Sequence, residues 1–291
     1  MFPIENYHYA VSVEDAVQHL TSNDQAGILA GGTDVLVRLH EGKDGYSHLV
    51  DINGLDELKT ITMDKSGAIF IGSRATFTEI ITNEIITKHL PMLAQSLLTI
   101  GGPQVRNTGT MGGNICNGAV SADSACAALV YEFDLRIQGP TGERTESIHG
   151  FHTGPGRTIL RQGDLLKYFV IRPENYTGFG ASYIKYAMRG AMDIATIGCG
   201  AAIKMNGEKV DTCKLAFTVA APTPVRCRTA EKIMEGVTIS EESLQRLADA
   251  VTDDVKPRTS WRASKEFRLH IIQTLAKKVT RQAVENQGGA C

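Results

Sequence analysis

The chain has 291 residues, a formal net charge of −2, 42% hydrophobic residues and 21% charged residues. This length is enough for two domains, and this composition is that of an ordinary globular protein. The near-neutral charge, with no basic block, argues against nucleic acid as a partner. The first residues lack the basic start and apolar run of a signal peptide, and no apolar run spans a bilayer, so we expect a cytoplasmic protein without membrane contact.

Six cysteines are scattered along the chain, without a C-x-x-C pair or a short cluster. Zinc and iron–sulfur sites usually take their ligands from closely spaced pairs, so neither is indicated and no metal is expected in this chain. Buried free thiols are the expected state. Cys116 is the exception to watch, because it lies within a glycine-rich stretch.

The first elements lead to a glycine pair. Residues 12–15 form a capping-box pattern before a short amphipathic helix, and residues 28–30 are expected to form a brief buried strand. The strand runs into Gly31-Gly32-Thr33-Asp34, where main-chain N–H groups could cradle a pyrophosphate. A glycine pair is also common in plain turns, so both interpretations stay open. A strand at 48–52 and a turn at Asn53-Gly54 follow.

A new unit is expected from about residue 55. It should contain a strand at 68–72, then a capping box at 76–79 that opens a helix with Ile80, Ile81 and Ile85 on its inner side. A helix from Pro91 should stop at Gly101-Gly102. Farther on, a strand and hairpin turn are expected at 135–142, and the strongest strand of this part spans 165–171, where Arg172-Pro173 ends it.

Residues 101–123 are dense in glycine, and Arg106 and Asp123 are their only charges. Such a composition disfavours both helix and strand, and it favours backbone that contacts a ligand, because glycines let successive N–H groups turn toward one anion. A helix is expected to start near Ser121 and Asp123, and a helix start beside a glycine nest suits a phosphate or polar cofactor. A glycine-rich structural turn is the alternative.

The segment from Pro173 to Gly180 is the expected boundary of a second domain. Strands at 182–187, 195–205 and 214–220 come before helices, which predicts a separate α+β domain. One helix is capped at Ser240, and the last carries apolar residues every four positions from Ala263 to Val279. The basic residues of that last region indicate either a solvated face or a docking surface for an acidic partner. They are Arg262, Lys265, Arg268, Lys277, Lys278 and Arg281.

Several familiar motifs are missing from the sequence, among them a G-x-G-x-x-G fingerprint in a Rossmann context, a P-loop and a G-x-S-x-G elbow. His149 and His152 lack a nearby carboxylate or thiol, so we interpret them as loop residues. Arg189 and Asp193 fit either a site or a surface turn. Two glycine-rich loops remain, at 29–34 and 110–114, and together they favour a dinucleotide held outside a Rossmann frame.

The two loops also carry a family resemblance. Leu29-Ala30-Gly31-Gly32-Thr33-Asp34 and Thr110-Met111-Gly112-Gly113-Asn114 resemble the paired FAD motifs of the medium, flavin-binding subunits of molybdenum hydroxylases. The motifs occur in order and at a suitable separation, with residues 101–107 just ahead of the second. Over almost the whole chain, the sequence most closely resembles the FAD-binding subunits of bacterial three-subunit xanthine dehydrogenases. The segments that carry this likeness are 121–124, 150–156, 221–226 and 261–268.

The resemblance implies an α+β fold in two parts. Residues 1–176 would form a two-part FAD-binding domain of the vanillyl-alcohol-oxidase (PCMH) type, with subdomains of about 1–54 and 55–176. Residues 177–291 would form a C-terminal α+β domain of the carbon monoxide dehydrogenase flavoprotein type.

The resemblance also implies site residues. Loops 27–34 and 110–114 would hold the pyrophosphate and ribityl chain, Asp123 would accept hydrogen bonds from the cofactor, and Leu166 would line the flavin pocket. Lys185 would reach the flavin from the second domain, where its charge would favour the reduced anionic ring. Ile100 stands where animal enzymes carry an aromatic residue. The implied cofactor-binding set is Gly27, Ile28, Leu29, Ala30, Gly31, Gly32, Thr33, Asp34, Thr110, Met111, Gly112, Gly113, Asn114, Asp123, Leu166 and Lys185.

The implied function is electron transfer within a xanthine dehydrogenase (purine hydroxylase) complex. A molybdopterin-binding large subunit would oxidise the purine, an iron–sulfur small subunit would relay electrons, and FAD in this chain would reduce NAD⁺. The heterotrimer is expected to assemble further. No catalytic acid or base is expected, because hydride transfer from flavin needs none. The alternatives are a flavin subunit of a sister hydroxylase for an aldehyde, another heterocycle or carbon monoxide, a flavin-free scaffold, and a self-contained flavin oxidase.

Overall fold

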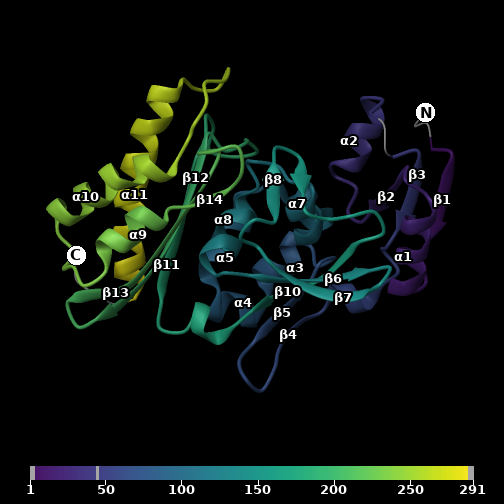
Figure 1. Cartoon of the computed structure of the whole chain (residues 1–291), viewed down its shortest axis with the longest axis horizontal. Helices are drawn as coiled ribbons and strands as arrows, with labels where there is room; N and C mark the ends of the chain where they lie inside the picture. Colours follow the sequence, from purple (N-terminus) through teal and green to yellow (C-terminus); the bar gives the residue numbers. More distant parts are fainter. Residues whose placement is uncertain (1–3, 44–45, 288–291) are drawn as a thin grey trace.

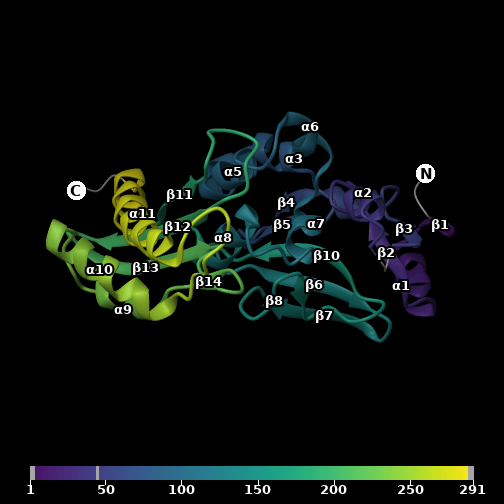
Figure 2. The ribbon, with the colours of Figure 1, turned by 90° about the horizontal axis from the view of Figure 1, so that it is seen from above.

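The computed structural model describes residues 4–43 and 46–287. The molecule is elongated, with an N-terminal three-stranded unit at one end and the helices of residues 228–286 at the other, in both views (Figures 1 and 2). Across these described ranges, the helices are too short or too polar to cross a lipid bilayer.

The N-terminal unit is a parallel sheet in the order β1-β3-β2, with its own small apolar core against α1. Its elements are β1 (Asn6–Tyr9), α1 (Val13–Ser22), β2 (Ala26–Leu29), α2 (Val35–His40) and β3 (His48–Asp51). Ser12 caps α1 as predicted, but the reciprocal half of the capping box is absent, because the Asp15 carboxylate accepts from the Val11 amide instead. The strand β2 is only half-buried, since it borders a pocket.

The middle unit is an antiparallel sheet in the order β4-β5-β10-β6-β7. Its strands are β4 (Ile61–Met63), β5 (Ile69–Gly72), β6 (Asp134–Gly139), β7 (Gly142–Ser147) and β10 (Leu165–Ile171), and a separate pair is β8 (His152–Gly154) with β9 (Arg157–Thr158). Packed with this sheet are η1 (Asp56–Lys59), α3 (Phe77–Thr82), α4 (Glu84–His89), α5 (Pro91–Leu98) and α8 (Asp123–Val130). The predicted strand at 165–171 and the hairpin are confirmed.

The single helix predicted to begin at the capping box of residues 76–79 is in fact two helices, α3 and α4. The full capping box at Thr76 and Glu79 is present, but the helix that it opens ends at Thr82. Asn83 then caps α4 by accepting from the Ile85 and Ile86 amides, and this restart buries Ile86 fully, while Ile81 and Ile85 pack against the core partly buried.

The glycine-rich stretch forms helices, so the prediction of little regular structure there is wrong. It contains α6 (Pro103–Thr108) and α7 (Met111–Cys116). Pro103 occupies the first turn of α6, where a missing N–H costs nothing, and Thr110 caps α7 by accepting from the Gly113 amide at 3.1 Å. The tight contacts that its glycines permit offset their poor helix propensity.

The C-terminal sheet is antiparallel in the order β11-β12-β13-β14. Its elements are β11 (Gly180–Tyr186), β12 (Ile197–Asn206), β13 (Lys209–Thr218), β14 (Val225–Arg226), α9 (Arg228–Met234), α10 (Glu241–Asp254) and α11 (Lys265–Asn286), and η2 (Pro173–Asn175) precedes them. The strands lie between α9–α11 on one side and α5 and α8 on the other (Figure 1). Both faces of β12 are therefore buried, with Cys199 and Ala201 in one core and Ala202 in the other.

The basic face predicted for the last helix is only partly present. Arg268 points inward, is 2% exposed, and donates to the Thr196 carbonyl and to Ser260 Oγ. Phe267, predicted on the apolar face, is exposed instead. A strict four-residue spacing drifts around a helix of 3.6 residues per turn, so the start of the series leaves the buried side.

Candidate functional site

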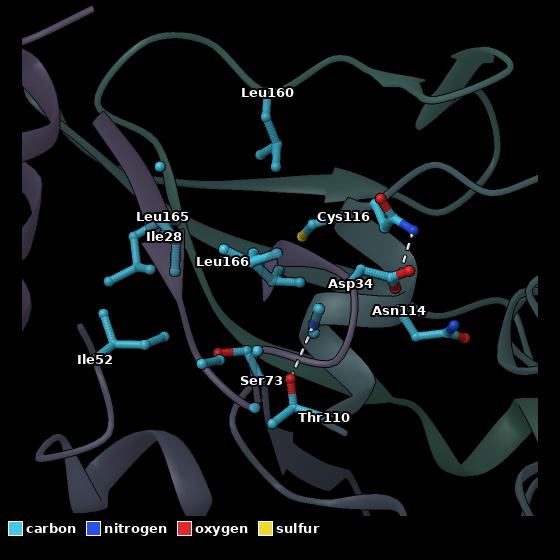
Figure 3. Close-up of a pocket in the computed structure, with 18 of the residues that line it drawn as sticks. Ile28, Asp34, Ile52, Ser73, Thr110, Asn114, Cys116, Leu160, Leu165 and Leu166 are labelled. Atoms are coloured by element: carbon cyan, nitrogen blue, oxygen red, sulfur yellow. Dashed lines mark hydrogen bonds between the residues drawn. The ribbon is translucent and has the colours of Figure 1, made fainter. Parts of the chain in front are cut away.

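A cavity of about 680 Å³ lies between the N-terminal parallel sheet and the antiparallel sheet. Figure 3 shows its two halves. Ile28, Ile52 and Leu165 gather in one half, the polar side chains of Asp34 and Asn114 lie in the other, and Leu166 lies between them. An apolar slot joined to a polar one suits a ligand with both flat rings and charged groups.

The first glycine bend offers unpaired backbone donors. The amides of residues 31–34 find no acceptor among the residues that the structure describes, and all four residues line the cavity. Gly32 has φ +71°, the left-handed conformation with which a short turn points successive N–H groups to one side. A Cβ on Gly31 would lie 1.8 Å from the Thr108 carbonyl oxygen, so only glycine lets this bend rest on the end of α6.

The second bend differs from the first because its amides are already bonded. The Met111 amide donates to the Ala75 carbonyl at 3.1 Å, and the Gly112 amide donates to the Ser73 carbonyl at 2.8 Å. Gly113 donates to its own cap, Thr110 Oγ1. The interpretation of two equivalent amide nests is therefore supported only at the first bend. At the second, α7 forms a wall of the cavity.

Side chains join the two bends across the polar half. Asn117 Nδ2 donates to Asp34 Oδ2 at 3.2 Å, and Arg38 donates to Asn117 Oδ1 and to the Tyr46 hydroxyl. Arg38 brings a positive charge to the cavity wall. Sequence reasoning missed Arg38, Tyr46 and Asn117. The position of Arg38 four residues after Asp34, on the same face of a short helix, was the signal that could have found it.

The loop before β10 covers the apolar half. Asp164 accepts from both terminal nitrogens of Arg144, at 2.8 and 2.6 Å, and from the Arg161 amide at 2.7 Å. Burial opposes the charge of Asp164, but these hydrogen bonds and the guanidinium lower its pKa below the usual value. Gln162 Nε2 donates to the Asn23 carbonyl at 2.7 Å, which ties the loop to the end of α1.

Most of the predicted binding residues line the cavity. They are Gly27, Ile28, Ala30, Gly31, Gly32, Thr33, Asp34, Thr110, Gly112, Gly113, Asn114 and Leu166. Leu29 and Met111 lie beside it without lining it, and Met111 is fully buried. Cys116 and Ile100 also line the cavity. Burial raises the pKa of the Cys116 thiol to about 12, so it is neutral at physiological pH.

Asp123 and Lys185 come together, but outside the cavity wall. Lys185 Nζ donates to Asp123 Oδ2 at 2.9 Å and to the Thr99 carbonyl at 3.0 Å, and the Tyr183 hydroxyl donates to Asp123 Oδ1 at 2.5 Å. Burial raises the pKa of Asp123, and the Lys185 charge partly opposes the rise. Ile100 follows Thr99 in the chain and lines the cavity, so the bond from Lys185 to the Thr99 carbonyl connects the pair to the cavity wall. Their contact with a cofactor stays a prediction.

The remaining candidates form no shared site. His152 lies in β8, not in a loop, and its Nε2 is 3.0 Å from the Ile115 carbonyl oxygen. Burial lowers its pKa, so the imidazole is neutral. His149 lies 3.9 Å from Glu132 instead. Arg189 and Asp193 belong to an exposed turn, in which the Arg189 amide donates to Asp193 Oδ2 at 3.0 Å.

Comparison with known proteins agrees with this geometry. Residues 2–173 match the family described as the FAD binding domain in molybdopterin dehydrogenase, and residues 182–283 match the CO dehydrogenase flavoprotein C-terminal domain. The chain is 48% identical over 289 residues to the xanthine dehydrogenase FAD-binding subunit of Escherichia coli O157:H7, covering 99% of each. It is 29% identical to the carbon monoxide dehydrogenase medium chain of Hydrogenophaga pseudoflava, covering 97% of each.

A solved structure has the same fold as this chain. Carbon monoxide dehydrogenase from Hydrogenophaga pseudoflava, in a form that lacks the Mo-pyranopterin moiety, contains a chain that superposes with a TM-score of 0.93 at 29% identity. The match covers 98% of this chain and 99% of that one. The predicted α+β fold is confirmed, and the chain belongs to the family of FAD-binding subunits of molybdenum hydroxylases.

Proposed function

We propose that this chain is the FAD-binding electron-transfer subunit of a xanthine dehydrogenase complex, which takes electrons from an iron–sulfur partner and reduces NAD⁺. The observation that carries the proposal is the 48% identity, over 289 residues, to a protein named as such a subunit. The relatives at lower identity act in other reactions by their names, so the substrate assignment rests on the likeness at 48% identity.

The residues of the cavity suit FAD. When bound, FAD takes up electrons one or two at a time and gives up a hydride. The unpaired amides of residues 31–34 and the Arg38 guanidinium would hold the negative diphosphate. Ile28, Ile52 and Leu165 would exclude water from a flat ring. The Gln162 loop would keep this half of the cavity covered.

The proposed partners are a molybdopterin-binding large subunit and an iron–sulfur small subunit, in a heterotrimer that assembles further. The names "medium chain" and "medium subunit" among the relatives support companions of two other sizes. A cytoplasmic location is part of the proposal, supported by the five cysteines that the structure describes, all of them free and four of them buried. We also retain the proposed division at residues 176 and 177, which the separate C-terminal apolar core supports.

The first test is the absorption spectrum of the purified full chain, with the released cofactor identified by mass. The proposal expects a yellow protein that releases FAD in close to equimolar amount. A colourless chain that cannot be loaded with FAD, but still joins its partners, would establish the scaffold alternative instead.

The second test concerns the reaction. The 29% identity to a carbon monoxide dehydrogenase medium chain favours a sister enzyme as the rival. The complex should be purified through a tag on this chain and assayed with xanthine, aldehydes, other heterocycles and carbon monoxide, each with NAD⁺. Xanthine-dependent NADH formation supports the proposal. Turnover of another substrate alone assigns the rival, and turnover by the isolated chain assigns a self-contained oxidase.

A further inference from the structure

Three side chains of metal-binding type converge away from the cavity, between β1 and α1. They are His8, Asp15 and His19, and their ligand atoms all lie within 4.8 Å of one another. His8 Nε2 is 2.8 Å from Asp15 Oδ2, and His19 Nε2 is 3.6 Å from Asp15 Oδ1. Each of the three is partly exposed, so an ion could reach them from solvent.

These separations match the spacing of ligands around one small ion. Nitrogen and oxygen ligands at about 2.0–2.1 Å from a tetrahedral Zn²⁺ ion stand roughly 3.3 Å apart. The two imidazole rings are stacked with centroids 3.4 Å apart and planes 18° apart. Because an imidazole binds an ion in the plane of its ring, one of the stacked rings must rotate out of the stack before both Nε2 atoms can bind one ion.

His19 is the most exposed of the three side chains, with 43% of it accessible to solvent. Its Nε2 lies 3.6 Å from Asp15 Oδ1, which is too far for a hydrogen bond, and within the described chain its ring donates or accepts none. The ring is nevertheless held face to face with His8. The stack and the ion pair therefore keep His19 beside the carboxylate, within reach of an ion bound there.

The fold holds the carboxylate ready for such a role. Asp15 and His19 are four residues apart on α1 and so share one helix face. The Val11 amide donates to Asp15 Oδ2 at 2.9 Å, which fixes the carboxylate as an outer-shell partner fixes a metal ligand. That bond, and then the one with His8, lower the pKa of Asp15, so the group is ionised at neutral pH.

We propose that His8, Asp15 and His19 form a binding site for a divalent transition-metal ion of the Zn²⁺ type, with water completing the coordination. Two imidazoles favour Zn²⁺, Ni²⁺ or Cu²⁺ over Ca²⁺ and Mg²⁺, which prefer all-oxygen sites. The ion would link β1 to α1 and so brace the unit that carries the first glycine bend. The site stands apart from FAD binding and does not depend on the proposed function.

The test uses the full chain without a histidine tag, treated with a chelator and then dialysed. Titration with Zn²⁺ in a calorimeter should show one ion per chain, and Ca²⁺ should show none. His19→Gln should weaken Zn²⁺ binding by about 100-fold or more, since the loss of an outer-shell partner alone costs about 10–100-fold. His270→Gln, which removes an exposed histidine of α11, is the matched control and should bind as the wild type does.

His19→Gln removes no hydrogen bond within the described chain, so its folding should be normal, and the metal-free melting temperature and far-ultraviolet circular dichroism check this. As a second readout, Co²⁺ should give visible ligand-field bands in the wild type that Asp15→Asn and His19→Gln lose. The proposal is overturned if the wild type shows no one-to-one Zn²⁺ binding, or if His19→Gln retains wild-type affinity.

Discussion

At the scale of single residues, the glycine bends at 31–34 and 110–114 differ in what their backbone amides bind. Within the described chain the amides of residues 31–34, which line the cavity, have no acceptor, whereas Met111 and Gly112 donate theirs to Ala75 and Ser73. The sequence motifs look alike because both need glycine. At Gly31 and Gly112, however, the glycine is required by contact with the carbonyl oxygens of Thr108 and Ser73.

This difference leads to a prediction at Thr33, an exposed residue of the first bend that lines the cavity. Thr33→Asp should weaken FAD binding by roughly 10–100-fold, because a carboxylate near the diphosphate costs about 1–3 kcal/mol at an effective dielectric constant near 20. Flavin fluorescence on titration of the apoprotein measures the change. Thr252→Asp, on the exposed side of α10, is the control. Equal affinity in the two variants would place the diphosphate elsewhere.

The contacts of Asp164 lead to a prediction about the stability of the folded chain. Its bidentate bond with Arg144 and its bond with the Arg161 amide are lost or weakened in Asp164→Asn. We expect Asp164→Asn to lower the free energy of unfolding, measured in urea, by about 2 kcal/mol. Asp56→Asn should change it by less than about 0.5 kcal/mol, because the Asp56 side chain is 93% exposed and lies 3.6 Å from Arg74.

The pH dependence of the Asp164 contribution has a definite sign. The folded-state pKa of Asp164 is lowered, so its stabilisation is present above the ordinary value of 3.8 and is lost as the pH falls below it. The wild type should therefore lose more stability than Asp164→Asn on acidification through this range. Parallel acid-unfolding curves for the two proteins would contradict the assignment.

At the scale of elements, α7 shows how contact overrides propensity. A Cβ on Gly112 would lie 2.4 Å from the Ser73 carbonyl oxygen, whereas a Cβ on Gly113 would meet only Thr110 Oγ1, at 3.0 Å. Alanine is the better helix former at both positions by about 1 kcal/mol. Gly112→Ala should nevertheless destabilise the chain by about 2 kcal/mol, because the backbone at Ser73, just after β5, and α7 must separate.

The neighbouring substitution is the matched control for Gly112→Ala. Gly113→Ala should change the free energy of unfolding by less than about 1 kcal/mol, since the gain in propensity offsets a small shift of Thr110. Chemical denaturation followed by circular dichroism measures both variants. Equal destabilisation would mean that the Ser73 contact does not determine the cost.

At the scale of the whole molecule, the sheet β11–β14 is shared between two cores. Tyr183 and Lys185 extend from β11 to Asp123 at the start of α8, 60 and 62 residues earlier in the chain. Lys185 and Asp123 are 9% and 5% exposed, so the pair lies where a lone charge is costly. The pair ties the C-terminal sheet to the part of the chain that carries the cavity.

Lys185→Met should therefore lower the free energy of unfolding by about 3 kcal/mol, because it leaves Asp123 buried and unpaired. Burial already raises the pKa of Asp123 above 3.8, and loss of Lys185 raises it further. A raised folded-state pKa means that the variant loses stability as the pH rises from about 4 toward the new value. Urea unfolding at several pH values tests this, with the exposed Lys232→Met as control. If the stability difference between the wild type and Lys185→Met did not change with pH, the prediction would be refuted.

The sequence by itself determined much of the local structure and the family. The strand at 165–171, the caps at Ser12, Thr76 and Ser240, and the hairpin at 139–142 depend on neighbours a few residues away, so periodicity and capping predict them. The paired glycine motifs were enough to identify the family, which the comparisons confirm.

Only the tertiary structure decided which groups face the cavity. The link between Arg38 and Asn117 joins residues 79 positions apart, and the bond of Gln162 to the end of α1 spans 139. The helix α7 exists where glycine propensity argued against it, because Ser73 and Ala75 accept its first amides. Local rules describe a chain over about one helical turn, whereas free amides, buried charges and cavity walls result from contacts between distant segments.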